Sequence, residues 1–471
     1  MALLWTLTRK ELLHGLLTFR FAAALLVMML LWGVSLWTFG NDLLDRKSAH
    51  EHGRSMQEQE RRQMPHAWAA RGFGMSYRIP PQPLSLFARG LEEEMTGTWR
   101  FTGEVASVPY RGVTRVGAGP FYENPARALF AVPDPQTILR LVGSLLALLF
   151  TTDALTRERE QGTLALCLAQ PVPRDLLLLG KLVGTWVLLI LASLVAGAGA
   201  LAAMVPVVGI QLTGGEWLRL AALAGIGALY LLCFCAVGLA LSAWLRETGT
   251  SLLAGLAVWV LLVMVGAGLA RAVGEQARSM ESPAQLEGRK IALVVSADRR
   301  ISTEFRFHVN GTWDPKEYEI HYRRRQAARE QAESELAAQF SRFDQDYLPA
   351  LEDQEGLVRQ LARWSPSSCF LHLAQGLAGT GGSDAQRLRR VLRRHLQRMD
   401  EYWREKAARL GWEGPVEASG WEDAPRLVLP AWTWTQWLAD GLVDLVLLAL
   451  WTVTAFLAAF RGFRRMSLVA E

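Results

Sequence analysis

Residues 182–215 read LVGTWVLLILASLVAGAGALAAMVPVVGIQLTGG and contain no Asp, Glu, Lys or Arg. Two further charge-free stretches, residues 220–245 and 248–270, follow closely. A helix needs about 20 apolar residues to cross the hydrocarbon core of a bilayer. These stretches therefore predict an α-helical integral membrane protein with several spans, and they exclude a purely soluble enzyme.

The composition of the chain agrees with this prediction. Hydrophobic residues make up 51% of the 471 residues, and charged residues make up only 20%. The 18 tryptophans and the lack of a short repeat exclude a disordered or collagen-like chain. The net charge is +5, and no basic stripe with interleaved aromatic residues occurs, so we expect no nucleic-acid partner.

Six spans account for the apolar blocks. Residues 182–215 would form a helix about 51 Å long, which exceeds one crossing, so we place a short turn after Pro206. Residues 136–155 can cross if Arg140 and Asp153 reach the two interfaces. The predicted spans cover residues 21–39, 136–155, 182–206, 217–244, 250–272 and 434–460. In residues 1–20, leucines alternate with charged side chains, which predicts an amphipathic helix at the interface.

Basic residues in short loops predict the orientation of the spans. They gather in residues 1–20, in residues 156–181, at Arg246 and in the tail, residues 461–471. Short basic loops stay in the cytoplasm, and six spans place all four segments on one side. We therefore expect both termini in the cytoplasm.

The same arrangement leaves two large extracytoplasmic domains. Residues 40–135 are polar and loop-rich, with short helices expected near 52–64 and 84–95. Residues 273–430 are predicted to be mainly helical, with a small sheet near residues 290–313 because the run IALVV at 291–295 is typical of a strand.

Two apolar stripes in the second domain recur at spacings of three and four residues, as in amphipathic helices. We expect Ser383 or Asp384 to cap the second of these helices. The first stripe is formed by Ala332, Leu336, Phe340, Phe343 and Tyr347, and the second by Leu388, Val391, Leu392, His395, Leu396, Met399 and Trp403.

The sequence contains no recognisable catalytic constellation. It has no nucleotide-binding glycine loop followed by Lys and Ser or Thr, no HExxH, no GxSxG and no CxxC motif. Four scattered cysteines provide no disulfide framework and are expected to be packing residues. We therefore expect no catalytic residue, no metal site and no cofactor bound directly by this chain.

One charged segment is informative. Residues 157–164 read REREQGTL, residues 170–174 read QPVPR, and Gly180-Lys181 follows. Physically this is a short charged helix end and a glycine break, in which Glu158 and Glu160 are expected to face solvent. The segment is either a generic solvated loop or a docking surface for a soluble partner.

These motifs resemble the loop after the second span in permease subunits of ABC-2-type transporters. More specifically, the chain resembles the subgroup with two large outer domains. The first outer domain of that subgroup is similar to residues 83–90 and 124–125, and the second is similar to residues 364–367 and 377–380. The resemblance covers nearly the whole chain. It implies a bacterial inner-membrane permease that pairs with a second permease copy or a paralogue and docks separate ATPase subunits, which would bind ATP and Mg. The cargo is not specified.

The resemblance also assigns roles to individual segments. Residues 1–20 would form the elbow helix at the cytoplasmic leaflet, and residues 156–181 would form the coupling loop to the ATPase. The docking and coupling residues implied in this way are Arg157, Glu158, Arg159, Glu160, Gly162, Thr163, Pro171 and Arg174. The alternative function is a membrane-anchored sensor or assembly scaffold whose outer domains bind a partner, although no cytoplasmic segment is long enough for an output domain.

Two carboxylates near the outer end of the sixth predicted span need an explanation. Asp440 and Asp444 share a helical face, and an unpaired carboxylate in the hydrocarbon is costly. They could pair with Arg140 of span two or Arg219 of span four. Alternatively, they could lie in a wet interface beside neighbouring tryptophans.

Overall fold

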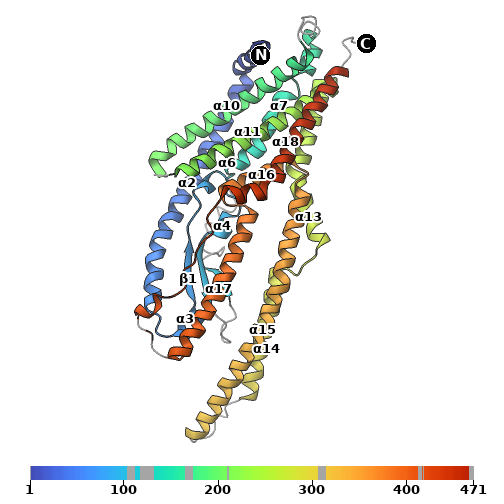
Figure 1. Cartoon of the computed structure of the whole chain (residues 1–471). Coiled ribbons are helices and arrows are strands. Elements are labelled where there is room, and N and C mark those ends of the chain that lie inside the picture. Colours follow the sequence, from blue (N-terminus) through green and yellow to red (C-terminus); the bar gives the residue numbers. More distant parts are fainter. Residues whose placement is uncertain are drawn as a thin grey trace.

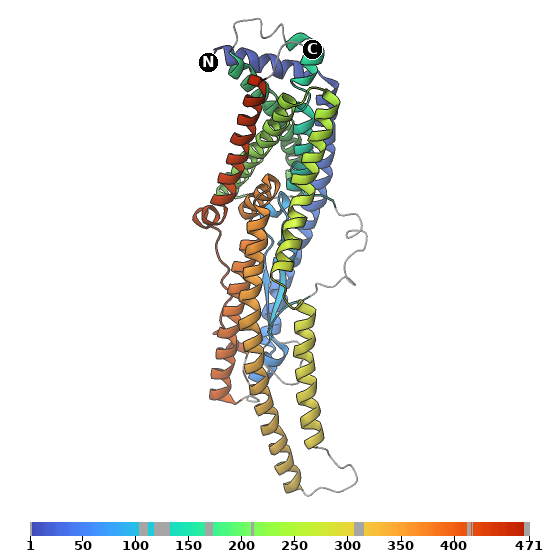
Figure 2. The ribbon, with the colours of Figure 1, turned by 90° about the vertical axis from the view of Figure 1, so that its right-hand side faces the viewer.

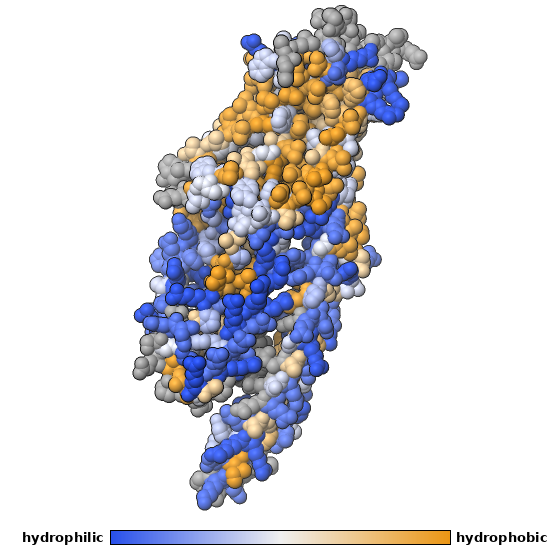
Figure 3. Space-filling view, in the orientation of Figure 1, coloured by the Kyte–Doolittle hydropathy of each residue, from blue (hydrophilic) through white to orange (hydrophobic). Residues whose placement is uncertain are grey.

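The computed structural model describes residues 2–102, 112–116, 132–164, 173–208, 212–305, 315–411, 416 and 418–465. The molecule is elongated, with a helical bundle at one end and a long polar extension at the other (Figure 1). Both ends of the chain lie at the far end of the bundle (Figure 2). A broad hydrophobic surface covers the bundle, and the extension is mostly hydrophilic (Figure 3).

Within the described residues, six helical stretches are long and apolar enough to cross a membrane. The predicted α-helical membrane protein with six spans is therefore confirmed, and the chain is a multi-pass membrane protein. The first, third, fourth and sixth stretches belong to α2 (Phe19–Arg62), α10 (Arg174–Val208), α11 (Gly214–Trp244) and α18 (Trp434–Arg465). The second consists of α6 (Pro135–Ile138), η2 (Leu139–Gly143), α7 (Ser144–Thr151) and α8 (Thr156–Glu160), and the fifth of α12 (Thr248–Trp259), η3 (Val260–Val265) and α13 (Gly266–Ala277).

Helix α11 lies at the centre of the bundle, where it packs against α7, α10, α18 and α16 (Pro366–Ala378). Its Tyr230 and Phe234 are fully buried, and Tyr230 stacks on Phe370 with ring centroids 4.4 Å apart. Gly238 allows α7 to approach closely, because a Cβ there would lie 2.0 Å from the Thr151 hydroxyl. Small residues at such crossings let membrane helices pack by van der Waals contact.

The second and fifth spans each contain a widened π turn, in η2 and η3. Such a turn leaves a carbonyl without its usual helical partner. The Tyr230 hydroxyl donates to the Arg140 carbonyl at 2.9 Å, and the Ser365 hydroxyl donates to the Leu262 carbonyl. Both irregularities are therefore satisfied by neighbouring helices.

The first part of the extension is a lobe around a small sheet. Helix α2 runs on from the bundle into this lobe and is followed by α3 (Ala67–Phe73), β1 (Met75–Ile79), η1 (Pro83–Leu86), α4 (Glu92–Met95), β2 (Gly97–Thr102) and β3 (Gly112–Val116). The strands form an antiparallel sheet in the order β1-β2-β3, with Tyr77 opposite Trp99. Helix α17 (Gly382–Leu410) packs on this sheet and buries Met399 and Trp403.

The second part of the extension is a helical hairpin that projects furthest from the bundle (Figure 2). It consists of α14 (Pro283–Glu304) and α15 (Pro315–Ala362), and the chain then continues through α16 (Pro366–Ala378). The predicted first stripe is buried in part, since Ala332, Leu336 and Phe340 have 2–7% of their surface exposed. The remaining described elements are α1 (Ala2–Leu16) and η4 (Ala418–Trp421).

The small sheet was predicted in the wrong domain. Residues 291–295 lie in α14, where the Ser282–Gln285 capping box starts a helix. Val294 faces α15 while Ile291 and Val295 remain exposed, which is a helical and not a strand-like pattern of burial. The sheet instead forms within the first polar region, from residues 75–116.

Several local predictions were also wrong. Residues 52–62 are not a separate helix but the end of α2, and residues 84–95 form a 3₁₀ turn and a single helical turn. Helix α17 begins at Gly382 after Gly381, and Asp384 accepts from the Gly381 N–H at 3.2 Å from inside the helix. Residues 174–181, predicted as loop, already belong to α10.

Candidate functional site

The charged segment after the second span folds into α8 at one end of the bundle. We call α8 and the residues bonded to it the junction. Its start is capped by another helix, because the Ser242 hydroxyl of α11 accepts hydrogen bonds from Leu155 N at 2.9 Å and Thr156 N at 3.2 Å. Free N–H groups at a helix start need such acceptors. The cap fixes α8 to the end of the fourth span.

A buried cation ties α8 to two other helices. Lys181 of α10 is 4% exposed, and its ammonium group lies 2.6 Å from Glu158 Oε1 and 3.3 Å from Glu11 Oε1 of α1. A buried charge is tolerated only when opposite charges compensate it. Lys181 therefore holds the N-terminal helix, α8 and the third span together.

Glu160 connects α8 to the fifth span. Its carboxylate accepts from Thr248 N at 2.7 Å and from the Thr248 hydroxyl at 2.8 Å. Thr248 is the first residue of α12, so Glu160 satisfies a free N–H and places negative charge at the positive end of a helix. The Ser251 hydroxyl adds a bond to the Thr152 carbonyl at 2.7 Å.

The first span and the N-terminal helix join the same junction. Arg20 of α2 pairs with Asp153 at 2.5 Å. Helix α1 lies against α10 at two glycines, because a Cβ at Gly180 or Gly184 would fall within 3 Å of Leu7 or Glu11. A force on α8 therefore reaches spans one to five through short polar contacts.

The outward face of the junction is small and polar. Arg157, Gln161, Gly162 and Thr163 are exposed, and the Thr163 hydroxyl folds back onto the Glu158 carbonyl at 3.2 Å. Gly162 has φ +71°, a left-handed conformation that favours glycine, and no atom lies near its Cβ position. Among the described residues, the turn thus presents an uncovered surface.

The predicted coupling residues divide into two groups. Arg157, Gly162, Thr163 and Arg174 are exposed, whereas Arg159 is half-buried and Pro171 lies outside the described residues. Glu160 is exposed, as expected, although its carboxylate is bonded to Thr248. The expectation that Glu158 faces solvent was wrong, because Glu158 is half-buried and its carboxylate is paired with Lys181. Nothing in the sequence indicated Ser242 and Thr248, and Lys181 was noted only as part of the charged segment, directly before a long apolar block.

A second polar cluster lies where the sixth span meets the extension. Asp444 of α18 has no exposed surface, and Arg363 donates to it from Nε at 3.2 Å and from a terminal nitrogen at 3.1 Å. His372 Nδ1 of α16 lies 3.1 Å from the same carboxylate. Asp440 pairs with Arg387 of α17 at 2.5 Å.

This cluster overturns the predicted pairing with Arg140 or Arg219, and for Asp444 it also overturns the wet-interface explanation. Arg219 does not pair with them, because it donates to the Leu377 carbonyl at 2.7 Å and lies over the Trp432 ring. Arg140 makes no ion pair with a described carboxylate. Asp444 is not in a wet interface either, because it is fully buried. The partners come instead from α16, α17 and the end of α15.

Comparison with known proteins decides the family. The family model for ABC-2 family transporter proteins matches residues 5–468. The chain belongs to this family. Two curated proteins, each named probable ABC transporter permease protein NosY, are also similar to part of this ABC-2 protein.

The relative from Pseudomonas aeruginosa strain PAO1 is 38% identical over 161 residues, covering 34% of this chain and 56% of the relative. The relative from Stutzerimonas stutzeri is 36% identical over 127 residues, covering 26% of this chain and 44% of the relative. The matched stretches thus span about half the length of these curated relatives.

Within the described residues, no group of three His, Cys, Asp or Glu side chains could hold a metal ion. Cys233, Cys235 and Cys369 are fully buried packing residues, and Cys167 lies outside the described residues. The junction exposes a turn on one side and makes polar contacts with five spans on the other.

Proposed function

We propose that this chain is the membrane-spanning permease subunit of an ATP-driven ABC exporter, and that the junction receives a separate ATPase subunit. The observation that carries this proposal is the family match over residues 5–468. The junction supports it, because its exposed turn is backed by rigid contacts to several spans. A docked subunit that moves α8 would therefore move the bundle as a body.

In this proposal the junction and both termini face the bacterial cytoplasm, and the lobe and hairpin lie outside the inner membrane. The basic residues of the short segments support this orientation. ATP and Mg are bound by the ATPase subunit, and this chain binds neither directly. A second permease copy or a paralogue completes the transporter, and it covers part of the apolar surface that this chain leaves exposed.

The test is to co-express the chain with an ABC ATPase and to compare Arg157→Glu with a matched control. Arg157 is exposed on α8, so its reversal leaves the junction contacts intact while changing the charge that meets a partner. Arg324→Glu reverses an equally exposed arginine in the hairpin, at the opposite end of the molecule.

We expect Arg157→Glu to weaken ATPase co-purification and to lower ATP hydrolysis stimulated by the permease in proteoliposomes. Arg324→Glu is expected to change neither. No co-purification of an ATPase with the unmodified chain, or equal effects of the two substitutions, would count against the proposal.

A further inference from the structure

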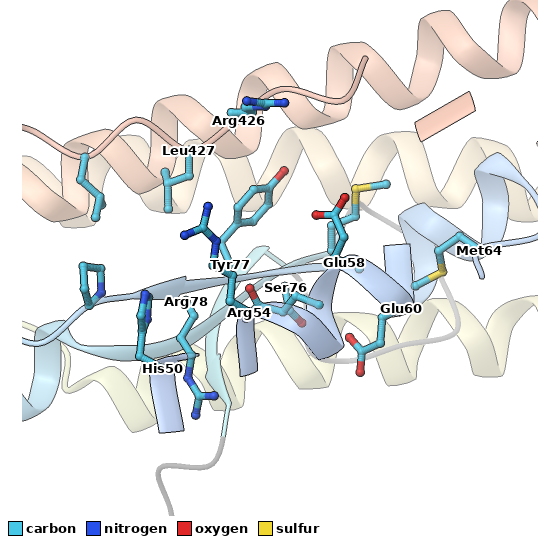
Figure 4. A pocket seen from close by; sticks show the side chains of 15 residues that line it. His50, Arg54, Glu58, Glu60, Met64, Ser76, Tyr77, Arg78, Arg426 and Leu427 are labelled. Carbon is cyan, nitrogen blue, oxygen red and sulfur yellow. The ribbon is translucent and has the colours of Figure 1, made fainter. Parts of the chain in front are cut away.

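A cavity in the lobe and a cavity in the bundle are both large enough for a small ligand, because such sites have volumes of about 300–1,000 Å³. The lobe cavity, of about 420 Å³, lies between α2, β1 and residues 426–429 (Figure 4). Charged side chains on its walls already have partners, since Glu58 pairs with Arg62 at 3.7 Å and Arg78 donates to the Ala49 carbonyl. The bundle cavity has walls of a different kind.

The bundle cavity, of about 300 Å³, lies between α10 and α11 in the half of the bundle nearest the extension (Figure 1). Its walls include residues of α10 between positions 193 and 201 and residues of α11 between positions 217 and 224. At 1.5 Å per residue, these segments are about 10–12 Å long. One leaflet of hydrocarbon is about 15 Å thick, since the whole core measures about 30 Å. The cavity therefore runs along most of the hydrocarbon depth of one leaflet.

This cavity opens sideways through the apolar surface of the bundle. Leu194 of α10 and Trp217 of α11 line it, and they have 52% and 49% of their surface exposed. Ala198 and Ala224 also line the cavity, and they add only methyl groups to its walls. In a membrane, the neighbours of such an opening are the hydrocarbon chains of lipids.

The cavity is too narrow for a helix of a second protein chain. Its volume divided by its length gives a mean cross-section of about 25–30 Å². A helix about 10 Å across needs roughly 80 Å². A single hydrocarbon chain is only about 4–5 Å wide, because non-bonded carbon atoms approach to about 3.5–4.0 Å, and it fits this cross-section.

Gln136, near the start of the second span, adds a buried polar group to the cavity wall. It is 4% exposed, and its amide nitrogen donates to the Leu371 carbonyl at 3.4 Å. A carbonyl can only accept, so this bond fixes which end of the amide is the nitrogen. The Gln136 Oε1 atom has no hydrogen bond from a described residue. Buried acceptors are nearly always bonded, so this oxygen lacks a donor that a ligand can supply.

We propose that the bundle cavity binds one acyl chain of a phospholipid from the leaflet nearest the extension, and that the headgroup donates a hydrogen bond to Gln136 Oε1. The chain lies between α10 and α11, and the headgroup lies at the extension end of the cavity. The preferred headgroup carries an N–H or O–H group, as ethanolamine does and choline does not. This inference requires only a bundle that spans a membrane, so it stands apart from the docking of an ATPase subunit.

The test adds lipid to the delipidated full chain in detergent and counts the bound lipids by native mass spectrometry. Dioleoyl phosphatidylethanolamine and dioleoyl phosphatidylcholine have the same chains and differ in the headgroup donor. We expect one phosphatidylethanolamine to bind about tenfold more tightly than any further lipid. It should also bind about tenfold more tightly than phosphatidylcholine, as for one hydrogen bond that involves a charged group.

Two substitutions fill the cavity from exposed positions, namely Ala198→Phe and Ala224→Phe. Each should weaken the binding of the first lipid about tenfold or more, whichever headgroup it carries. Ala439→Phe serves as the matched control, because it adds the same ring to an exposed alanine of α18 outside the cavity. It should bind lipid as the unmodified chain does.

Gln136→Leu separates the headgroup contact from the binding of the chain. It removes the acceptor and keeps a side chain of similar size, so one lipid should still bind. The preference for phosphatidylethanolamine over phosphatidylcholine should disappear, because neither lipid then has an acceptor to bond at this position.

Unchanged melting temperatures would establish that these variants are folded, and the two filling positions keep the test valid if one of them unfolds. Absence of a tightly bound first lipid overturns the proposal, and so does full retention of that lipid in the folded filling variants. Equal affinities of the unmodified chain for the two lipids overturn the contact with Gln136.

Discussion

Lys181 lies among apolar helices with 4% of its surface exposed, and two carboxylates compensate its charge. Removing one partner of such a buried group lowers the free energy of unfolding far more than changing a surface charge does, because the remaining charge loses part of its compensation. The two neighbouring residues Arg157 and Glu158 therefore differ in how they should respond to substitution, although both belong to one short helix.

Glu158→Lys is expected to destabilise the protein by about 3 kcal/mol or more, because it places a second ammonium group against Lys181. Arg157→Glu should change stability by only about 0.5 kcal/mol, as an exposed substitution does. Thermal melting in detergent, followed by size-exclusion chromatography, measures the difference. Equal melting temperatures for the two variants would contradict a stabilising ion pair between Glu158 and the buried Lys181.

His395 of α17 gives a prediction about pH. It is 3% exposed, packs edge-on against Tyr77 and Phe101, and leaves Nε2 without a hydrogen bond. Burial, helped by the charge of Arg398, lowers the pKa of His395 to about 4. The folded lobe thus prefers the neutral ring, so its stability is complete above pH 6.5 and is lost as the pH falls toward 4.

We expect the unmodified chain to lose on the order of 1–3 kcal/mol of lobe stability between pH 7 and pH 4 through this group. His395→Phe should remove that part of the pH dependence, since it keeps the aromatic packing without a titratable ring. Melting curves of both proteins over this range measure it. Parallel pH profiles would show that His395 is not held neutral.

At the scale of elements, the Asp444 cluster joins the sixth span to α16 and the end of α15. In the sequence, Arg363 lies 81 residues from Asp444, and His372 lies 72 residues from Asp444. Arg363 contacts the fully buried Asp444 carboxylate through two nitrogens. We expect this contact to fix the position of the extension relative to the bundle.

We expect Asp444→Leu and Arg363→Met each to destabilise the protein by about 3–5 kcal/mol, because each removes one partner of a buried ion pair. The double variant should be more stable than either single variant, since it leaves no uncompensated charge of this pair. A double-mutant cycle of melting measurements tests this. Additive losses would contradict a direct interaction.

The sequence predicted the helices of the bundle well because the length of an apolar run is a local property. Long charge-free blocks predicted the third, fourth and fifth spans, and the spacing of Leu392, Met399 and Trp403 predicted the buried face of α17. These signals need no knowledge of tertiary contacts.

Other features depended on contacts that a sequence does not reveal. β1 contains Ser76 and Arg78 and lacks a strong strand signal, and it forms a strand because β2 and α17 cover it. The partners of Asp444 could not be predicted, because only the fold brings Arg363 to it. Glu158 resembled a surface charge until the position of Lys181 was known.

At the scale of the whole molecule, the junction and the hairpin lie at opposite ends, with the bundle between them (Figure 1). If the bundle spans a membrane, the two ends are in different compartments. Gln161 and Arg324 are both exposed. A single cysteine introduced at either position reports which compartment that end of the molecule faces.

We expect Arg324→Cys to react with a membrane-impermeant maleimide in intact cells, and Gln161→Cys to react only after permeabilisation. Cys167→Ser provides the background, because Cys233, Cys235 and Cys369 are fully buried. The reverse labelling pattern would invert the proposed orientation, and labelling of both sites in intact cells would contradict a spanning bundle.

Helix α2 has 44 residues without a break, and it begins beside the junction and ends in the lobe. At 1.5 Å per residue it is a rod about 66 Å long, so a tilt of about 5° at one end displaces the other by about 6 Å. It contains no proline and no π turn, which are common causes of sharp kinks, so it offers no such hinge to absorb this rotation. The lobe at its far end is consequently carried along as the load on a lever arm, and a small angular stroke inside the bundle becomes a long excursion beyond it.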